Sequence, residues 1–295
     1  MLNKQRVKKY LTGYFLVVPS FLFLFLFTYY PIVRSIWLSF FGKIGSTTIH
    51  FIGLKNYVEM LTDEIFQTVL KNNLIYALFS TIPAIVLGLF TAVILNGKII
   101  GRGFFRFSLF YPTILPVSAA SMIWVFLFSQ SLGLVNKILD VFHLSSSIDW
   151  LNTSPYAMSA IIIVYIWKYV GYYMLLFLSG LQSIDESLYE EAYLEGATPW
   201  ERFKMITFPL LSPTTFFIVL IAIINSVQAV DQIYVMTNGG PYNSTNVLLF
   251  YIYQHGFIFW NTGLASSASV ILFAVLLIIT FLYYYGLQHF INYER

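Results

Sequence analysis

The chain lacks cysteine, and only 10% of its 295 residues are charged. Without cysteine it can form neither disulfide bonds nor thiolate metal sites, and thiol catalysis is excluded. Soluble domains usually carry about 25% charged residues. The low charge, with 58% hydrophobic residues and a mean hydropathy of +0.75, is therefore typical of a membrane protein. A net charge of +3 is too small to indicate a nucleic-acid partner.

The sequence also lacks the motifs by which a protein hydrolyses ATP or catalyses a reaction. Neither Gly42 nor Gly97, each followed by lysine, has the upstream glycine of a phosphate-binding loop. No H-E-x-x-H zinc motif and no G-x-S-x-G nucleophile motif occurs, and the four histidines are far apart in the chain. We therefore expect a chain that is not an enzyme and that binds no metal or cofactor.

Long apolar runs are what the chain does have. A helix needs about 20 apolar residues to cross a bilayer. The runs predict six such helices, at about 11–40, 70–97, 105–130, 156–182, 209–236 and 264–289. The first run follows several basic residues, as a signal peptide does, but it stays uncharged as far as Val33 without a clean cleavage site. The predicted fold class is all-α, with residues 1–295 forming one polytopic transmembrane domain.

Lysine and arginine set the predicted orientation, because cytoplasmic loops of membrane proteins carry an excess of both. With the N-terminus inside, the outer segments hold only Lys43, Lys55, Lys71 and Lys137. The inner segments hold Lys4, Arg6, Lys8, Lys9, Lys98, Arg102, Arg106, Arg202, Lys204 and Arg295. We therefore expect both termini, and residues 185–208, on the cytoplasmic side.

Residues 185–208 predict two short helices that meet at an angle. The first runs from about Asp185 to Glu195, and Gly196 stands where a left-handed residue commonly ends a helix. Thr198 and Glu201 have the spacing of a capping box, with Pro199 at the first helical position of the second helix. This pattern suits a well-capped cytoplasmic loop, and it equally suits a rigid lever that a partner can grip.

The same residues resemble the EAA motif of ABC-importer permeases. "EEAYLEGA" followed by "FKMITFPLLSP" keeps the motif's spacing from Gly196 to Pro209, while Glu191, Glu195 and Phe208 replace its alanine, aspartate and leucine. In that family the segment is a coupling helix that docks in a cleft on the ATPase subunit. The resemblance implies ATPase contacts for Glu190, Glu191, Ala192, Glu195, Gly196, Ala197, Thr198, Pro199, Phe203, Ile206 and Pro209.

The resemblance extends over nearly the whole chain and points to the carbohydrate-uptake branch, to first-permease subunits of the glycerol-phosphate and maltose type. "FFRFSLFYPTILP" and "IWKYVGYYMLLFLSGLQSI" look like its landmarks, and "TNGGP" at 237–241 matches its Thr-x-Gly-Gly-Pro. It implies a type I importer in a bacterial cytoplasmic membrane, working by alternating access. The implied partners are a second permease, two ATPases that bind ATP and Mg²⁺, and an external binding protein that delivers a carbohydrate, with an oligosaccharide favoured.

Polar residues inside the predicted spans are candidates for a solute path, because such groups are costly in a membrane. In the fourth predicted helix they share one face: Tyr165, Lys168, Tyr169 and Tyr172. In the fifth they are Asn225, Ser226, Gln228, Asp231 and Gln232. By similarity, family members line their sugar site from these two helices, at positions that here also include Ala222 and Ala229. Hydrogen bonds between helices explain the same residues without a solute.

Several alternatives remain open at this point. Lys168 either neutralises Asp231, binds an acidic solute, or has the structural role that we favour. The solute is a carbohydrate, or else a glycerophosphate or acidic sugar. A self-sufficient secondary transporter would need paired intramembrane carboxylates or repeated broken helices. The outer loop around residues 131–150 predicts a short amphipathic helix that either lies on the bundle or contacts the binding protein.

Overall fold

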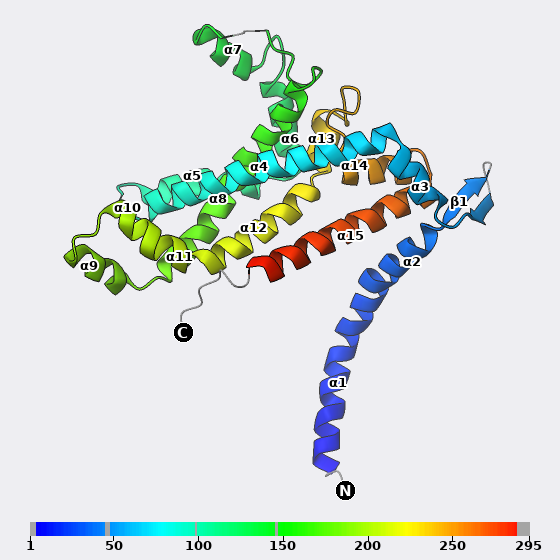
Figure 1. Ribbon diagram of the computed structural model, residues 1–295, viewed down its shortest axis with the longest axis horizontal. Coiled ribbons are helices and arrows are strands. Elements are labelled where there is room, and N and C mark those ends of the chain that lie inside the picture. The colour runs from blue at the N-terminus through cyan, green and yellow to red at the C-terminus, as the bar shows by residue number, and fades with distance from the viewer. Residues whose placement is uncertain (1–3, 45–47, 98, 145–146, 288–295) are drawn as a thin grey trace. The chain divides into compact units, whose positions relative to one another are not determined.

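The computed structural model describes residues 4–44, 48–97, 99–144 and 147–287 (Figure 1). Lys98 and Arg295, and the side chains of residues 4–11 and 43, all used in the orientation prediction, lie outside this description. The described chain is mostly helical and divides into two compact units. Unit 1 comprises residues 1–62 and 252–273, and unit 2 comprises residues 63–251 and 274–295.

Unit 1 begins with one long helix, in which α1 (Lys4–Leu24) passes through a π-turn (Phe25–Tyr29) into α2 (Tyr30–Leu38). An antiparallel hairpin follows, with β1 (Phe41–Ile44) paired to β2 (Thr48–Phe51), and then α3 (Lys55–Thr62). The all-α prediction missed this hairpin. The reason is that a four-residue strand is too short to leave a periodic signal beside a long apolar run.

Buried amide and hydroxyl groups hold the hairpin in unit 1. The Asn56 amide donates to the carbonyl oxygens of Ser39 and Phe41, at 2.7 and 2.9 Å. The Ser267 hydroxyl also donates to the Ser39 carbonyl, at 3.1 Å, from α15 (Thr262–Leu287). At Gly263 a Cβ atom would lie 1.9 Å from the Phe41 carbonyl oxygen, so only glycine allows this approach.

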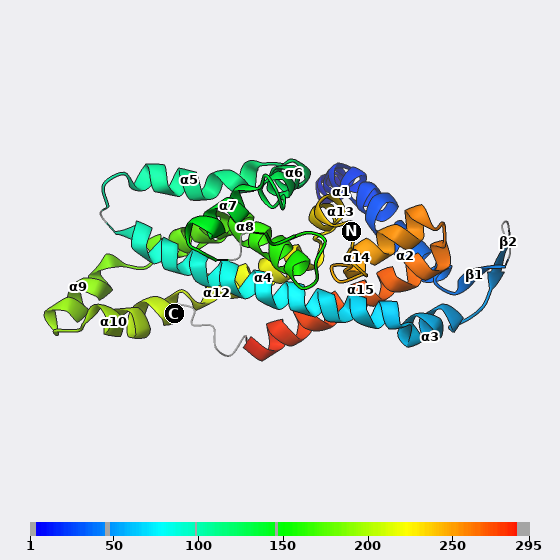
Figure 2. The same cartoon turned by 90° about the horizontal axis from the view of Figure 1, so that it is seen from above.

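The core of unit 2 is a helix pair, α4 (Glu64–Asn96) and α8 (Tyr156–Gln182), which lie side by side in both ribbon views (Figures 1 and 2). The prediction of a helix over 156–182 is confirmed, and α4 begins about six residues before the predicted 70. Glycines bring the backbones together. At Gly88 a Cβ atom would lie 2.9 Å from that of Tyr173, and at Gly171 it would lie 1.9 Å from the Leu109 carbonyl oxygen.

Two predicted helices are broken in the structure. The continuous helix expected over 105–130 is wrong: α5 (Arg102–Ile114) and α6 (Val117–Leu127) meet at a bend of 101°. Pro116 explains this bend, since a residue before proline, here Leu115, is driven out of the helical region. Both helices are visible in Figure 1, where α5 lies along α8 and α6 turns away from it.

The continuous helix expected over 209–236 is also wrong. A 66° bend at Leu211 separates 199–210 from α12 (Ser212–Val227), and Pro213, two residues after Leu211, lacks the N–H that would continue the hydrogen bonds of the preceding helix. The helix then stops at Val227, and α13 (Asp231–Met236) is a separate short helix. Two short elements follow along the chain, α14 (Leu248–Tyr253) and a π-turn (Gln254–Ile258). The last long helix, α15, begins after them at Thr262. The end of the predicted span 264–289 lies outside the described residues.

The predicted amphipathic helix of the outer loop is confirmed as α7 (Leu134–Val141). It is anchored through buried Asn136, which donates to the carbonyl of Ile148 at 2.8 Å and accepts from the Trp150 indole at 2.9 Å. Its apolar side chains are mostly exposed, including Ile138 and Phe142. They are therefore not covered by the described helices.

Among the described residues, four helical stretches are long and apolar enough to cross a bilayer: Thr12–Leu38, Glu64–Asn96, Tyr156–Gln182 and Thr262–Gly286. The two bent pairs, 102–127 and 199–227, bring the number to six if each makes one crossing. The structure thus supports a helical protein with four to six candidate spans.

Candidate functional site

Residues 185–208, called the 185–208 segment below, start with a capped helix, α9 (Glu186–Leu194). The carboxylate of Asp185 accepts a hydrogen bond from the backbone N–H of Ser187, at 2.9 Å. This bond, with a weaker one from the Ser187 hydroxyl, holds the pKa of Asp185 below its ordinary value of 3.8. The cap fixes where α9 begins, one residue later than the sequence predicts.

A Schellman motif ends α9 at the predicted glycine. Gly196 has a φ of +84°, in the left-handed region that favours glycine. Its N–H donates to the Tyr193 carbonyl at 3.0 Å, and the N–H of Ala197 donates to the Ala192 carbonyl at 2.9 Å. These two bonds are the pair that defines the motif. They satisfy the last carbonyls of α9 and set the direction in which the chain leaves it.

The second helix, α10 (Pro199–Arg202), carries the predicted capping box, which is confirmed. The Thr198 N–H donates to the Glu201 carboxylate at 2.7 Å, and the Glu201 N–H donates to the Thr198 hydroxyl at 3.3 Å. Two hydrogen bonds from Thr198 hold the pKa of Glu201 below its ordinary value of 4.5. The bond from the Thr198 backbone contributes most, and the bond from its hydroxyl contributes less. Both helices of the segment therefore have fixed starts.

Two contacts fix the angle between α9 and the chain that returns to the membrane. The hydroxyls of Tyr189 and Thr207 lie 3.0 Å apart, which joins α9 to the π-turn Phe203–Thr207. The guanidinium of Arg202 lies 5.7 Å from the centre of the Tyr193 ring, a cation–π distance. Sequence reasoning missed these residues because each pair joins positions far beyond helical spacing.

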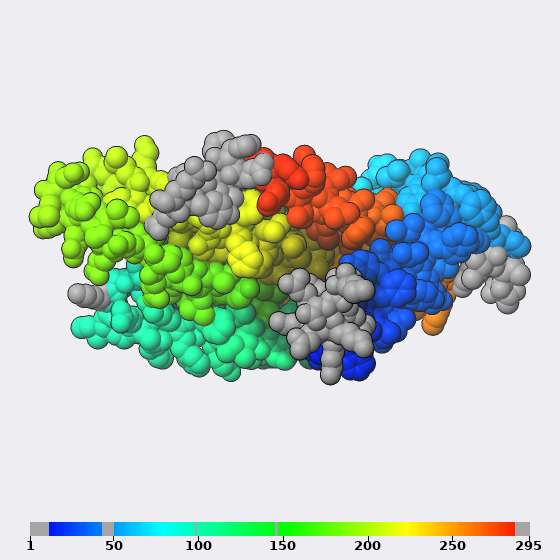
Figure 3. Space-filling view, turned by 90° about the horizontal axis from the view of Figure 1, so that it is seen from below, coloured from blue at the N-terminus to red at the C-terminus, as the bar shows by residue number. Residues whose placement is uncertain are grey.

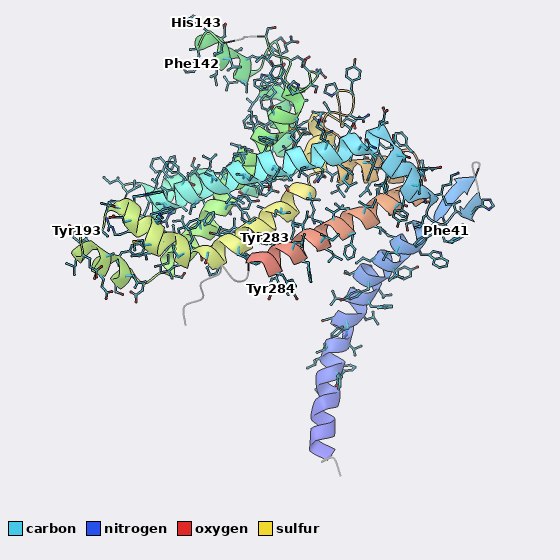
Figure 4. The ribbon with its side chains drawn as sticks, in the orientation of Figure 1. Phe41, Phe142, His143, Tyr193, Tyr283 and Tyr284 are labelled. Carbon is cyan, nitrogen blue, oxygen red and sulfur yellow. The ribbon has the colours of Figure 1, made fainter. Side chains whose placement is uncertain are left out.

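The surface of the segment is acidic and apolar together. Glu190, Glu191 and Glu195 are all exposed. Beside them Tyr193 is 68% exposed and Leu194 is 84% exposed. Figure 4 places Tyr193 at the outer margin of the segment, and Figure 3 shows the segment's atoms uncovered at one side of the surface.

Further apolar side chains on the segment are exposed, namely Trp200, Met205 and Phe208. Sequence analysis did not single out Tyr193, Leu194 or Trp200 as contact residues. Their signal was an apolar side chain in each turn of a predicted cytoplasmic helix, where polar residues are expected. A compact, capped surface with large apolar side chains and a row of carboxylates can bind a partner that offers a cleft with basic groups.

Five of the predicted solute-path residues line one cavity of about 180 Å³ in unit 2. These are Tyr165 and Tyr169 of α8, Asn225 of α12, Gln228 directly after α12, and Asp231 at the start of α13. Val117, Ala229, Val230 and Gln232 complete the lining. Aromatic rings, amides and a carboxylate are groups that can stack on a sugar ring and hydrogen-bond its hydroxyls.

Tyrosines form the wall of this cavity. The rings of Tyr165 and Tyr169 lie 4.5 Å apart, and Tyr76 of α4 stands edge-on to Tyr165 at 5.8 Å. The hydroxyl of buried Tyr165 lies 2.9 Å from that of Tyr173 and donates to the Ala222 carbonyl at 3.2 Å. These contacts fix the Tyr165 ring, so the wall has a defined shape.

Three predicted residues do not line the cavity. The Tyr172 ring packs at 5.5 Å against Tyr173, and the Ser226 hydroxyl donates to the Ile223 carbonyl of its own helix at 2.8 Å. The Lys168 ammonium donates to the Leu115 carbonyl at 2.5 Å, and Lys168 forms no salt bridge with Asp231. These contacts are compatible with the structural role that the sequence favours for Lys168, which stays a prediction.

Gln232, another polar residue of the fifth predicted helix, also lines the cavity. It is buried, its amide donates to the Ile161 carbonyl of α8, and its side-chain oxygen lies 3.5 Å from the Tyr76 hydroxyl. It therefore ties α13 to α8 and α4 beside Asp231. Among the described residues no group of three or more histidine, aspartate and glutamate side chains could hold a metal ion.

Unit 2 has other large hollows. One of about 540 Å³ between α12 and α15 is lined by apolar side chains that include Phe216, Phe281 and Tyr284, the last of which is labelled in Figure 4. Another, of about 760 Å³, is partly polar, and its lining includes Thr68, Lys71, Asn72, Ser159 and Ser244. We take the smaller cavity at Tyr169 and Asp231 as the candidate solute site because five of the predicted solute-path residues line it.

A family model and curated relatives both match most of the chain. A family model described as "Binding-protein-dependent transport system inner membrane component" matches residues 84–292. The chain is 34% identical to the sulfoquinovosyl glycerol transport system permease protein of Agrobacterium fabrum, over 91% of this chain and 87% of that protein. It is 32% identical to the trehalose/maltose transport system permease protein of Thermococcus litoralis, over 95% of both.

Among solved structures, a chain of a bacterial alginate ABC transporter, crystallised with its alginate pentasaccharide-bound periplasmic protein, has a similar fold. The TM-score is 0.87 at 21% sequence identity, and the match covers 99% of each chain. This likeness shows the fold.

Proposed function

The chain belongs to the family of binding-protein-dependent transport system inner membrane components, and from this premise we propose that it is the permease subunit of an ATP-driven carbohydrate importer. An external binding protein delivers the solute, and an oligosaccharide is the favoured class. The observation that carries the proposal is the 185–208 segment, in which a Schellman motif and a capping box present exposed carboxylates and apolar side chains.

We further propose six membrane crossings with both termini in the cytoplasm, in a bacterial cytoplasmic membrane. The bent pair α5 and α6 then makes one crossing, the span that begins at Pro209 and contains α12 makes another, and the chain is one transmembrane domain of the type I importer architecture. The excess of lysine and arginine in the predicted inner segments supports this orientation. The 185–208 segment is then on the same side as an ATPase.

Energy in this proposal comes from outside the chain. Two ATPase subunits bind ATP and Mg²⁺, and the chain contributes no nucleotide site and no cofactor. An ATPase can shift the permease between two states only through contacts that differ between them. The capped 185–208 segment suits this task, because the Tyr189–Thr207 and Arg202–Tyr193 contacts let it move as one body.

The solute path runs past the cavity at Tyr169 and Asp231, and a second permease closes it from the other side, forming a heterodimer. Tyrosine rings stack against the sugar faces, and the amides of Asn225 and Gln228 hydrogen-bond the hydroxyls. Tyr172, Ser226 and Lys168 support this wall from behind. α7, whose apolar side chains are exposed, is a candidate contact for the binding protein.

A self-sufficient secondary transporter is the main rival, and the two broken helices are a feature expected of one. One of the breaks, however, lies where the 185–208 segment joins α12, and family membership favours an ATP-driven importer. A glycerophosphate or acidic sugar as solute, in place of a neutral saccharide, leaves the architecture unchanged.

Reconstitution tests the proposal. The permease pair, the ATPase and the binding protein are purified and placed in proteoliposomes, and uptake of labelled maltose, trehalose and lactose is measured with and without ATP. We expect uptake only when all components and ATP are present. Uphill transport by this chain alone would overturn the proposal, and so would a cysteine-labelling map that puts the 185–208 segment outside.

A further inference from the structure

The candidate solute cavity has one acidic side chain and no basic one. Among its nine lining residues only Asp231 is of an acidic or basic type, and Asp231 is exposed. The other polar groups are the hydroxyls of Tyr165 and Tyr169 and the amides of Asn225, Gln228 and Gln232. This cavity therefore offers a solute one carboxyl group and neutral hydrogen-bonding groups, and no basic side chain lines it.

The nearest basic residue of α8 is turned away from the cavity. Lys168 is only 3% exposed, and its ammonium donates to the carbonyl oxygens of Pro112, Thr113 and Leu115 at 3.2, 3.3 and 2.5 Å. These oxygens lie at the end of α5, where the helix dipole favours positive charge. The ammonium is 6.0 Å from the centre of the Tyr169 ring, and Tyr169 lines the cavity while Lys168 does not. An anionic solute in the cavity would therefore meet no hydrogen bond from Lys168.

We propose that Asp231 makes this chain's side of the solute path select uncharged saccharides against those that carry phosphate or carboxylate groups. The inference deepens the proposed function and rests on it. A carboxylate accepts hydrogen bonds from sugar hydroxyls, and it repels a second anion strongly where protein and lipid replace water. Among the solutes left open by the sequence, this favours a neutral carbohydrate over a glycerophosphate or acidic sugar.

A purely structural role for Asp231 makes a different prediction. Asp231 is the first residue of α13, where a carboxylate stabilises the helix by its charge. If this were its only role, Asp231→Asn would weaken transport of neutral and anionic solutes alike. A role in selection instead changes the ratio between the two, and that ratio is the quantity to measure.

The test uses the purified permease–ATPase complex, with the same reconstituted transporter as a check on activity. Binding of methyl glucoside and methyl glucuronide, which differ only by the carboxylate, is measured by calorimetry, beside maltose and sn-glycerol 3-phosphate. We expect the wild-type complex to bind the glucoside at least tenfold more tightly than the glucuronide. Asp231→Asn should lower this preference by tenfold or more, and Asp231→Glu should retain it.

Asp140→Asn is the matched control, because Asp140 is an exposed aspartate of α7 and does not line the cavity. It should leave the preference unchanged. Equal binding of the two glycosides by the wild type, or an unchanged ratio in Asp231→Asn, would overturn the inference and leave the importer function standing. If no saccharide of either charge binds or is transported, the carbohydrate function fails and the inference fails with it.

Discussion

The ammonium nitrogen of Lys168 lies 2.5 Å from the carbonyl oxygen of Leu115, at the bend where α5 ends and α6 begins. The Thr113 hydroxyl donates in the opposite direction, to the Lys168 carbonyl at 2.8 Å. A break at membrane depth leaves carbonyl groups without helical partners, and each is costly if it stays unpaired. Lys168 supplies the donors that the break requires.

Removing the Lys168 ammonium should therefore destabilise the bent helix. A hydrogen bond to a charged group contributes roughly 1.5–3 kcal/mol, so Lys168→Met, which keeps the stem, should lower the unfolding temperature of the purified complex and its transport rate. Lys137→Met, on exposed α7, is the control for stability and should leave the unfolding temperature unchanged. A Lys168→Met complex as stable as the wild type would show that the carbonyls find other donors.

Gly196 should tolerate asparagine and reject proline. Its φ of +84° is closed to proline, which also lacks the N–H that bonds the Tyr193 carbonyl. Gly196→Pro should abolish ATP-driven uptake while the protein still inserts into the membrane. Gly196→Asn should retain most uptake, because no atom lies within 4 Å of the added Cβ and asparagine adopts left-handed conformations. Uptake measured in matched membrane vesicles decides this, and normal uptake by the proline variant would remove the segment's role in coupling.

The Tyr189–Thr207 contact predicts variants that hydrolyse more ATP for each solute molecule imported. Tyr189→Phe removes the hydroxyl that lies 3.0 Å from Thr207 and keeps the ring. Without this contact between the hydroxyls, movement of α9 would be transmitted less completely to α12. We therefore expect the number of ATP molecules hydrolysed per solute imported to rise by about twofold or more. Thr207→Val should act alike, and the double variant should be no worse than either alone. Additive losses would mean that the two hydroxyls act separately.

The capping box predicts how the segment responds to acid. The pKa of Glu201 is lower in the folded segment than its ordinary 4.5, so the cap contributes stability above that value and loses it as pH falls through the folded pKa. Hydrogen exchange at residues 198–202, corrected for intrinsic rates, should show more opening below about pH 4 than at pH 7. Glu201→Gln should remove this dependence. Opening that does not change with pH would contradict the cap's ionic character.

Much of this architecture could be predicted from local sequence. Helix α8 was delimited correctly because its apolar run is long and bounded by loop residues, and the caps at Asp185, Gly196 and Thr198 follow from side-chain chemistry within a few positions. The bends were missed because apolar composition does not distinguish one straight span from two helices. Pro116 and Pro213 carried that signal, yet proline is also common in straight membrane helices.

Side-chain direction is the part of the solute site that the sequence could not supply. Three- and four-residue spacing put Lys168 and Tyr172 on the same helical face as Tyr165 and Tyr169. In the structure α5 packs against α8, and the Lys168 ammonium donates to the Leu115 carbonyl at the end of α5. The Tyr172 ring packs on Tyr173. Which of several polar residues on a face reach a cavity depends on the neighbouring helices.

Tyr169 and Tyr172 form a matched pair for testing the solute site, since both are half-buried tyrosines of α8 and only Tyr169 lines the cavity. Tyr169→Ala removes a ring that lies 4.5 Å from Tyr165 and leaves the solute without a stacking surface. Sugar stacking on such a ring contributes on the order of 1 kcal/mol or more, so the apparent KM for the transported sugar should rise about tenfold. Tyr172→Ala removes a similar ring from the back of the wall. It should lower the transport rate through weaker packing, with little change in KM. Equal increases in KM for both variants would mean that the cavity wall, and not contact with the solute, sets the affinity.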